Sequence, residues 1–126
     1  MPHYLLQIYA PHEEVPADDP GQDIGRWRAF QEGLQESGML VASNRLYNPD
    51  SATTVRVRDG ETLITDGPFA ETAEFLGGYF LLDCPSLDAA LEQAARVPSI
   101  HYGSVEVRPV MGDPEGSPDA KAAAQA

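Results

Sequence analysis

Alternating apolar and polar residues mark the middle of the chain, where residues 53–65 read TTVRVRDGETLIT. An Asp-Gly pair between two alternating runs predicts a β-hairpin, because a type I′ turn needs positive φ at both central residues. A two-residue turn also fixes the register, which places Asp66 on the same face as Val55 and Ile64. Because that face is the more apolar one, we expect it to pack against the core. Its apolar residues are Val55, Val57 and Ile64.

The remaining periodicity predicts two helices and several further strands. Residues 22–37 repeat apolar side chains at helical spacing, and Gly38 is placed to end that helix. Ser86 is a suitable N-cap for a second helix, which Pro98 is expected to end. The predicted strands are residues 3–10, 39–46, 75–84 and 104–111. The apolar stripes are Ile24, Trp27, Phe30 and Leu34 in the first helix and Leu87, Ala90, Leu91 and Ala94 in the second.

Glycine and proline add local detail to this pattern. Gly77 and Gly78 weaken a strand interior and predict a bulge or a close approach to another backbone. Pro68 is compatible with the first turn of a short helix that contains Glu71 and Glu74. The order strand, helix, short strand, hairpin, strand, helix, strand predicts an α+β fold, a ferredoxin-like sandwich with an inserted β-hairpin.

The strands at 3–10 and 75–84 are apolar on both faces, whereas two helices cover only one face of a sheet. The other face needs a partner, so we expect a homodimer formed through sheet faces. The domain is expected to span residues 1–111. Residues 112–126 read GDPEGSPDAKAAAQA and have no large apolar residue to bury, which predicts a disordered tail.

Charge and composition exclude several classes of function. The formal net charge is −12, from 20 acidic and 8 basic residues, whereas nucleic acids and anionic membranes need a positive surface. No segment has the pattern of a signal peptide or a membrane span. The single cysteine, Cys84, cannot form an intramolecular disulfide and is expected to be a buried apolar residue. These features predict a cytoplasmic protein.

Residues 66–72 read DGPFAET and resemble the signature of the YCII-related family, in the branch called DGPF-domain proteins. Three further segments agree with it: TVRVR before the signature, LGGYF after it, and SVEVRPV near the C-terminus. The similarity covers roughly residues 3–111. The resemblance implies that two copies join their sheets in a dimeric α+β barrel. It also implies a link to pathways of extracytoplasmic-function sigma factors.

Asp66 and His101 are the candidate acid–base residues. A buried carboxylate has a shifted pKa, and histidine exchanges protons near neutral pH. Both residues also have structural interpretations, because Asp before Gly-Pro commonly accepts backbone N–H bonds and His101 is expected in a loop. Trp27 occupies the place where relatives closer to the family's namesake carry a helix histidine that is implied to act with an aspartate. The candidate walls of a ligand pocket are Tyr9, Trp27 and Phe69.

Two functions remain open. One is a small-molecule-binding or regulatory module of a sigma-factor-linked pathway, which the missing helix histidine favours. The other is a cofactor-independent lyase or isomerase in which Asp66 and His101 transfer protons on a small ring compound. No histidine pair has metal-ligand spacing with a carboxylate, and Gly77-Gly78 lacks the strand-to-helix context of a phosphate loop. We therefore expect no metal and no cofactor.

Overall fold

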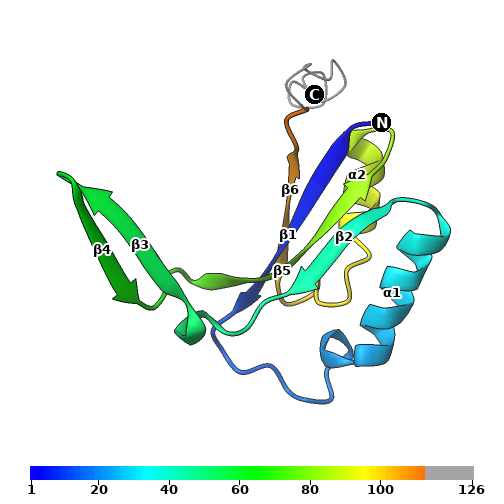
Figure 1. Cartoon of the computed structure of the whole chain (residues 1–126). Coiled ribbons are helices and arrows are strands. Elements are labelled where there is room, and N and C mark those ends of the chain that lie inside the picture. Colours follow the sequence, from blue (N-terminus) through cyan, green and yellow to red (C-terminus); the bar gives the residue numbers. More distant parts are fainter. Residues whose placement is uncertain (113–126) are drawn as a thin grey trace.

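The computed structural model describes residues 1–112, which form an antiparallel sheet covered on one face by two helices (Figure 1). The strands of this sheet lie in the order β2-β5-β1-β6, and a hairpin is inserted between β2 and β5. This arrangement confirms the ferredoxin-like α+β prediction. The elements of the sheet are β1 (His3–Pro11), β2 (Leu40–Arg45), β5 (Glu74–Asp83) and β6 (Ser104–Pro109), and the helices are α1 (Ile24–Glu36) and α2 (Leu87–Ala94).

The helix-covered face of the sheet holds the core. Alternate residues of β1 and β5 point into it, and Leu6 and Leu82 are completely buried. Leu34 of α1 and Ala90 of α2 close over them, and small side chains bring α2 close to the sheet. The buried apolar residues are Tyr4, Leu6, Ile8, Leu34, Phe80, Leu82, Cys84, Ala90, Ala94 and Val97. Cys84 is buried as predicted.

Two residues of the predicted helix stripes are not in the core. Ile24 is 65% exposed, because it opens α1 at a point beyond the packed part of the sheet. Leu91 is 46% exposed, because α2 packs through Ala90 and Ala94 and leaves Leu91 at the edge of the contact. The stripe predictions were therefore wrong at these two positions.

The helix ends follow local capping rules. The Asp23 side chain accepts a hydrogen bond from the Gly25 N–H at the start of α1, and Gly38 has a φ of 79° just after its end, as predicted. The Ser86 hydroxyl oxygen accepts from the Ala89 N–H at the start of α2, also as predicted. However, α2 ends at Ala94, before the predicted stop at Pro98, because the chain turns there and buries Val97.

The hairpin consists of β3 (Thr53–Arg58) and β4 (Glu61–Asp66), which form a separate two-stranded sheet that reaches away from the body (Figure 1). We call β3, β4 and their turn the hairpin arm. Asp59 and Gly60 have φ of 53° and 78°, and the register pairs Thr53 with Asp66, so the predicted type I′ turn and register are confirmed.

The predicted core face of the hairpin is wrong. Val55, Val57 and Ile64 are 60%, 58% and 69% exposed. The hairpin pairs with neither edge of the main sheet, so no strand or helix of the described chain covers its apolar face. Asp66 lies on this same face, as the register predicts, but it is exposed rather than aimed into a core.

The glycine predictions in β5 are confirmed. The register between β1 and β5 shifts beside Gly77, which is the extra residue of a bulge. A Cβ placed on Gly78 would lie 2.8 Å from the Asn44 carbonyl oxygen of β2, so this glycine lets two backbones approach closely. The short helix predicted from Pro68 is wrong, because the chain between Gly67 and Glu74 runs without a helical turn to connect the arm to the body. Glu74 itself begins β5.

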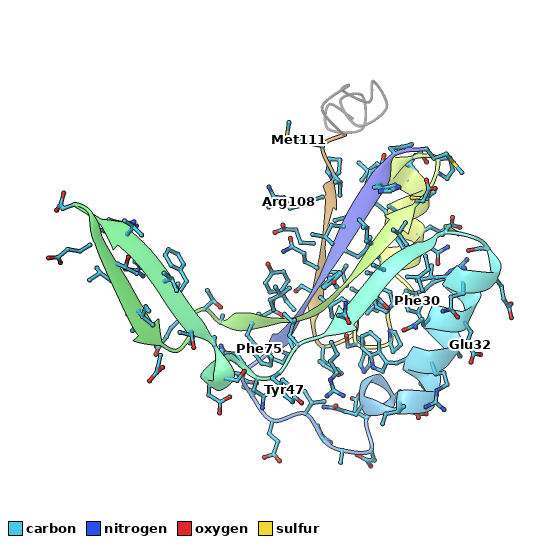
Figure 2. All side chains as sticks on the ribbon, in the orientation of Figure 1. Phe30, Glu32, Tyr47, Phe75, Arg108 and Met111 are labelled. Atoms are coloured by element: carbon cyan, nitrogen blue, oxygen red, sulfur yellow. The ribbon has the colours of Figure 1, made fainter. Side chains whose placement is uncertain are left out.

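The other face of the sheet carries no helix. Figure 2 shows Phe30 on the helix side of the sheet and Arg108 on the opposite side. The pairing of β1 with β5 and β6 places half-buried apolar side chains at the centre of this helix-free face, and polar residues surround them. Its members include Leu5, Gln7, Tyr9, Tyr79, Leu81, Glu106 and Arg108. A second copy covering this face stays a prediction.

Within residues 1–112, no helix is both long and apolar enough to cross a membrane. The predicted tail lies outside the described residues from residue 113 onward.

Candidate functional site

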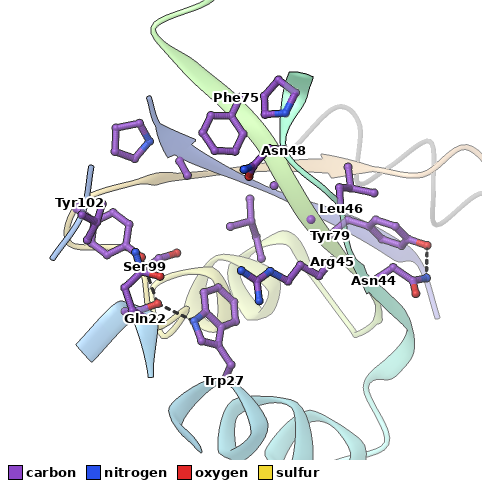
Figure 3. Close-up of a pocket in the computed structure, with 18 of the residues that line it drawn as sticks. Gln22, Trp27, Asn44, Arg45, Leu46, Asn48, Phe75, Tyr79, Ser99 and Tyr102 are labelled. Carbon is purple, nitrogen blue, oxygen red and sulfur yellow. Dashed lines mark hydrogen bonds between the residues drawn. The ribbon is translucent and has the colours of Figure 1, made fainter. Parts of the chain in front are cut away.

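A large cavity opens on the helix side of the sheet, at the end where β1 and β2 finish and β5 begins (Figure 3). Its volume is about 1430 Å³. Ile8, Gly78 and Phe80 supply part of its lining from the sheet, and the N-terminal half of α1 supplies another wall.

Aromatic rings line much of the cavity. Trp27 stacks against Phe80 with ring centroids 6.5 Å apart and an angle of 6° between the planes. Phe30 meets the same Phe80 ring edge-on at 5.1 Å. Phe75 and Tyr102 contribute further rings to the lining. Such a surface offers large apolar area and ring faces to a ligand.

The Gly21 carbonyl fixes two of these rings. It accepts a hydrogen bond from the Trp27 indole N–H at 2.7 Å and another from the Tyr102 hydroxyl at 3.1 Å. Gly21 is buried, and a Cβ at this position would overlap the Tyr102 ring. The short turn Pro20–Gln22 therefore holds two rings of the cavity in fixed orientations.

An acid–histidine pair lies behind this wall. The Asp19 carboxylate is 2.7 Å from the His101 Nε2 and also accepts the Gly21 N–H at 2.8 Å. The pair connects the loop before α1 with the loop before β6. The Gly21 N–H lowers the pKa of Asp19, partial burial opposes this change, and His101 lowers the pKa further. Asp19 thus positions the turn that carries Gly21.

Polar side chains occupy the β2 side of the cavity. Ser43 donates to Gln31 of α1 at 3.4 Å, while on the helix-free face the Asn44 amide donates to the Tyr79 hydroxyl at 2.8 Å. Arg45 ends β2, and its side chain extends into the cavity beside Trp27 (Figure 3). Burial raises the pKa of the Tyr102 phenol and Asp19 raises it further, while the positive charge of Arg45 lowers it.

Trp27 is the one residue among the sequence-predicted site residues that lines this cavity. His101 is bound to Asp19 on the other side of the Gly21 turn. Tyr9 lies on the helix-free face of the sheet. Phe69 is 71% exposed and carries the Arg56 guanidinium at 4.9 Å from its ring centre.

Asp66 lies at the end of the hairpin arm, and in the described part of the chain its carboxylate accepts no hydrogen bond. The hydrogen bonds from backbone N–H groups that were expected for the Asp66 carboxylate are therefore absent within residues 1–112. Backbone and hydroxyl groups hold this turn instead, through Gly67 N–H to Ala52 carbonyl at 2.7 Å and Thr54 hydroxyl to Gly67 carbonyl at 2.9 Å. Asp66 and His101 thus lie in different parts of the molecule, and no contact joins them among residues 1–112.

Sequence reasoning missed Asp19, Arg45 and Tyr102. Asp19 precedes Pro20 at the start of a turn, which is a recognisable capping pattern. Arg45 and Tyr102 have no such signal, because the cavity that they share is built from segments 57 residues apart in sequence. The described residues contain no group of three His, Cys, Asp or Glu side chains gathered as metal ligands.

Comparison with known proteins gives two findings. The family model described as the YCII-related domain matches residues 1–112. An uncharacterized protein of Rhizobium meliloti (strain 1021) is 45% identical over 84 residues, which are 65% of this chain and 68% of that protein. The family match covers the whole described domain, including both the hairpin arm and the cavity. The chain therefore belongs to the YCII-related family.

Proposed function

We propose that this protein is a small-molecule-binding module, and that its ligand binds in the cavity between α1 and the sheet. The observation that supports this most directly is the fixed aromatic wall, in which Gly21 orients both Trp27 and Tyr102. Ligand sites are typically concave, mostly apolar and supplied with a few placed polar groups. This cavity has that composition, with Ser43 and Arg45 on its polar side.

A regulatory role agrees with binding of this kind. The family resemblance implies a place in a sigma-factor-linked pathway. In such a pathway, a module that binds a ligand without changing it chemically acts as a sensor. The ligand's free energy of binding is then available to favour one state of the protein over another.

The enzyme alternative requires two titratable groups within reach of one ligand atom. Asp66 is on the exposed arm and His101 is bound to Asp19 behind the cavity wall. Because these groups do not converge, the geometry favours binding over proton transfer by this pair.

The second part of the proposal is that a second copy of the chain covers the helix-free face. Leu5, Tyr9 and Leu81 give this face an apolar centre that two helices on the opposite side leave open. Sedimentation equilibrium at micromolar concentration should give the mass of a dimer, and Leu81→Asp should give that of a monomer. A monomer mass for the wild-type protein contradicts this part of the proposal.

A thermal-shift screen of small planar compounds tests the binding function. A ligand that binds only the folded protein stabilises it by about 2.7 kcal/mol at a concentration of 100 times Kd. We expect at least one compound to raise the melting temperature of the wild type. Gln22→Trp, which adds bulk to an exposed residue of the cavity lining, should weaken that effect.

Glu92→Trp, on the exposed side of α2, is the matched control and should keep the effect. The proposed function is wrong if no compound stabilises the wild type, or if Gln22→Trp responds as fully as Glu92→Trp.

A further inference from the structure

Arg45 has an unusual position among the arginines of this protein. It is the last residue of β2 and lies opposite Gly78 in the register with β5. Gly78 places no side chain beside Arg45. Figure 3 shows it directed into the cavity toward the Trp27 ring.

The Arg45 guanidinium has no protein partner within the part of the chain that the structure describes. Arg26, Arg96 and Arg108 each have a carboxylate oxygen within 3.9 Å. Arg45 has no such ion pair and donates no hydrogen bond to residues 1–112. Its five N–H donors are therefore available to a ligand. Arg28 of α1 also lines the cavity and has no ion pair among these residues.

Acidic residues also contribute to the cavity lining, and all of them are exposed to solvent. They are Glu13, Glu14, Glu32, Asp50 and Glu71. Exposed charges are screened by salt over about 8 Å at physiological ionic strength. Among the residues labelled around the aromatic wall in Figure 3, Arg45 alone is charged. Arg45 is exposed as well, and it brings a positive charge next to Trp27 in a chain whose net charge is −12.

We propose that this cavity selects planar carboxylates, with the ligand's carboxylate held by the Arg45 guanidinium and its ring placed against Trp27. This inference rests on the proposed binding function and narrows it to a ligand class. A guanidinium is a planar fork that matches a carboxylate with two parallel N–H···O bonds. A flat conjugated ring attached to that carboxylate then lies beside the Trp27 indole. A neutral analogue of the same shape keeps the stacking and loses the charge-assisted bonds.

The single tryptophan makes this test specific to the cavity. In a ¹H–¹⁵N NMR spectrum of the full chain, the Trp27 indole N–H gives one side-chain signal, and this N–H points at Gly21 in the cavity wall. Titration with trans-cinnamate should move that signal. Titration with trans-cinnamamide, which differs in charge and little in shape, should move it with at least tenfold weaker affinity.

Arg45→Gln should lower the affinity for cinnamate about tenfold and leave the affinity for cinnamamide unchanged, since hydrogen bonds between two charged groups are stronger than those to a neutral group. Arg45→Lys keeps the charge without the fork and should give an intermediate affinity for cinnamate. Arg58→Gln on the hairpin arm removes the same charge far from the cavity and should bind both compounds as the wild type does. The backbone signals of each variant report directly that it is folded.

Equal affinity for the acid and the amide overturns the carboxylate inference and leaves the binding function standing. Tighter binding of the cationic analogue cinnamylamine also overturns it, because the acidic residues then dominate the site. If none of the three compounds moves the Trp27 signal, the carboxylate inference fails. The binding function is then judged by the wider thermal-shift screen.

Discussion

The body of the molecule and the hairpin arm both contain strands with apolar side chains, and they bury these side chains differently. In β1, Leu6 and Ile8 are 0% and 7% exposed, whereas in the arm Val55 and Ile64 are 60% and 69% exposed. Both segments form the strands that the hydrophobic pattern predicts. The difference is that α1 and α2 cover one face of the body, and no described element covers the arm. The hydrophobic pattern of the sequence therefore predicts which residues form strands and how the strands pair. Burial of the apolar side chains depends on whether other elements of the fold cover those strands.

The family signature lies between these two regions. Residues 66–72, which carry the most recognisable motif, connect the exposed arm to the body. The cavity is lined by rings and polar side chains that no short motif unites, such as Trp27, Arg45 and Tyr102. Four residues of the signature also line the cavity, namely Pro68, Ala70, Glu71 and Thr72, whereas Asp66 and Phe69 do not.

The largest expected contrast is between core and arm substitutions. Leu6→Ala should lower the free energy of unfolding by about 2–5 kcal/mol, because it leaves a cavity in the packed core. Val55→Ala on the arm should change it by less than about 0.5 kcal/mol, as exposed substitutions usually do. Urea unfolding followed by circular dichroism measures both. A comparable loss for the two variants contradicts an uncovered arm and shows that a partner buries Val55 in solution.

A pair of glycines tests how tightly the body is packed. A Cβ at Gly103 would overlap the Tyr9 carbonyl oxygen, so Gly103→Ala should destabilise the protein by about 1–3 kcal/mol through overpacking. Gly33 lies inside α1 with no atom within 4 Å of an added Cβ. Gly33→Ala should stabilise the protein by about 0.5–1 kcal/mol, since alanine is the better helix residue. Thermal unfolding gives both values, and a neutral Gly103→Ala contradicts the close approach of the two backbones.

Local sequence signals predicted much of this fold. The Asp-Gly turn at 59–60, the cap at Ser86 and the glycine bulge in β5 each depend on the conformation of a few adjacent residues. The exposure of Ile64 could not be predicted, because it depends on where the whole arm lies. The residues of the candidate site were harder to predict than the elements of the fold. Trp27 was predicted as a pocket wall because it occupies the place of a helix histidine in relatives, but Arg45 reaches the cavity from a strand that pairs with a distant segment, opposite Gly78.

Two aspartates give a smaller contrast, which depends on pH. In the body, hydrogen bonds from the Gly21 N–H and His101 hold the pKa of Asp19 below its ordinary value of about 3.9. A folded-state pKa below that of the unfolded chain stabilises the protein at pH above the unfolded value. The stabilisation is lost as pH falls through the folded pKa. Asp19→Asn should therefore lower the melting temperature at pH 5–7, and its difference from the wild type should vanish at strongly acidic pH.

Asp66→Asn is the matched control on the arm, because in the described chain its carboxylate accepts no hydrogen bond. Its melting temperature should follow that of the wild type at every pH. A pH-independent difference for Asp19→Asn would contradict the role of the Asp19 carboxylate in holding the Gly21 turn.

In the proposed function, the ligand binds at the aromatic wall of the cavity and not on the hairpin arm. The most direct measurement is a map of backbone amide shifts across the assigned ¹H–¹⁵N NMR spectrum as trans-cinnamate is added to the full chain. We predict that the largest shifts fall at Gly21, Arg45, Gly78 and Tyr102, together with the Trp27 indole N–H. Largest shifts at residues 53–66 of the hairpin arm, with the Trp27 indole signal unmoved, would contradict this placement of the ligand.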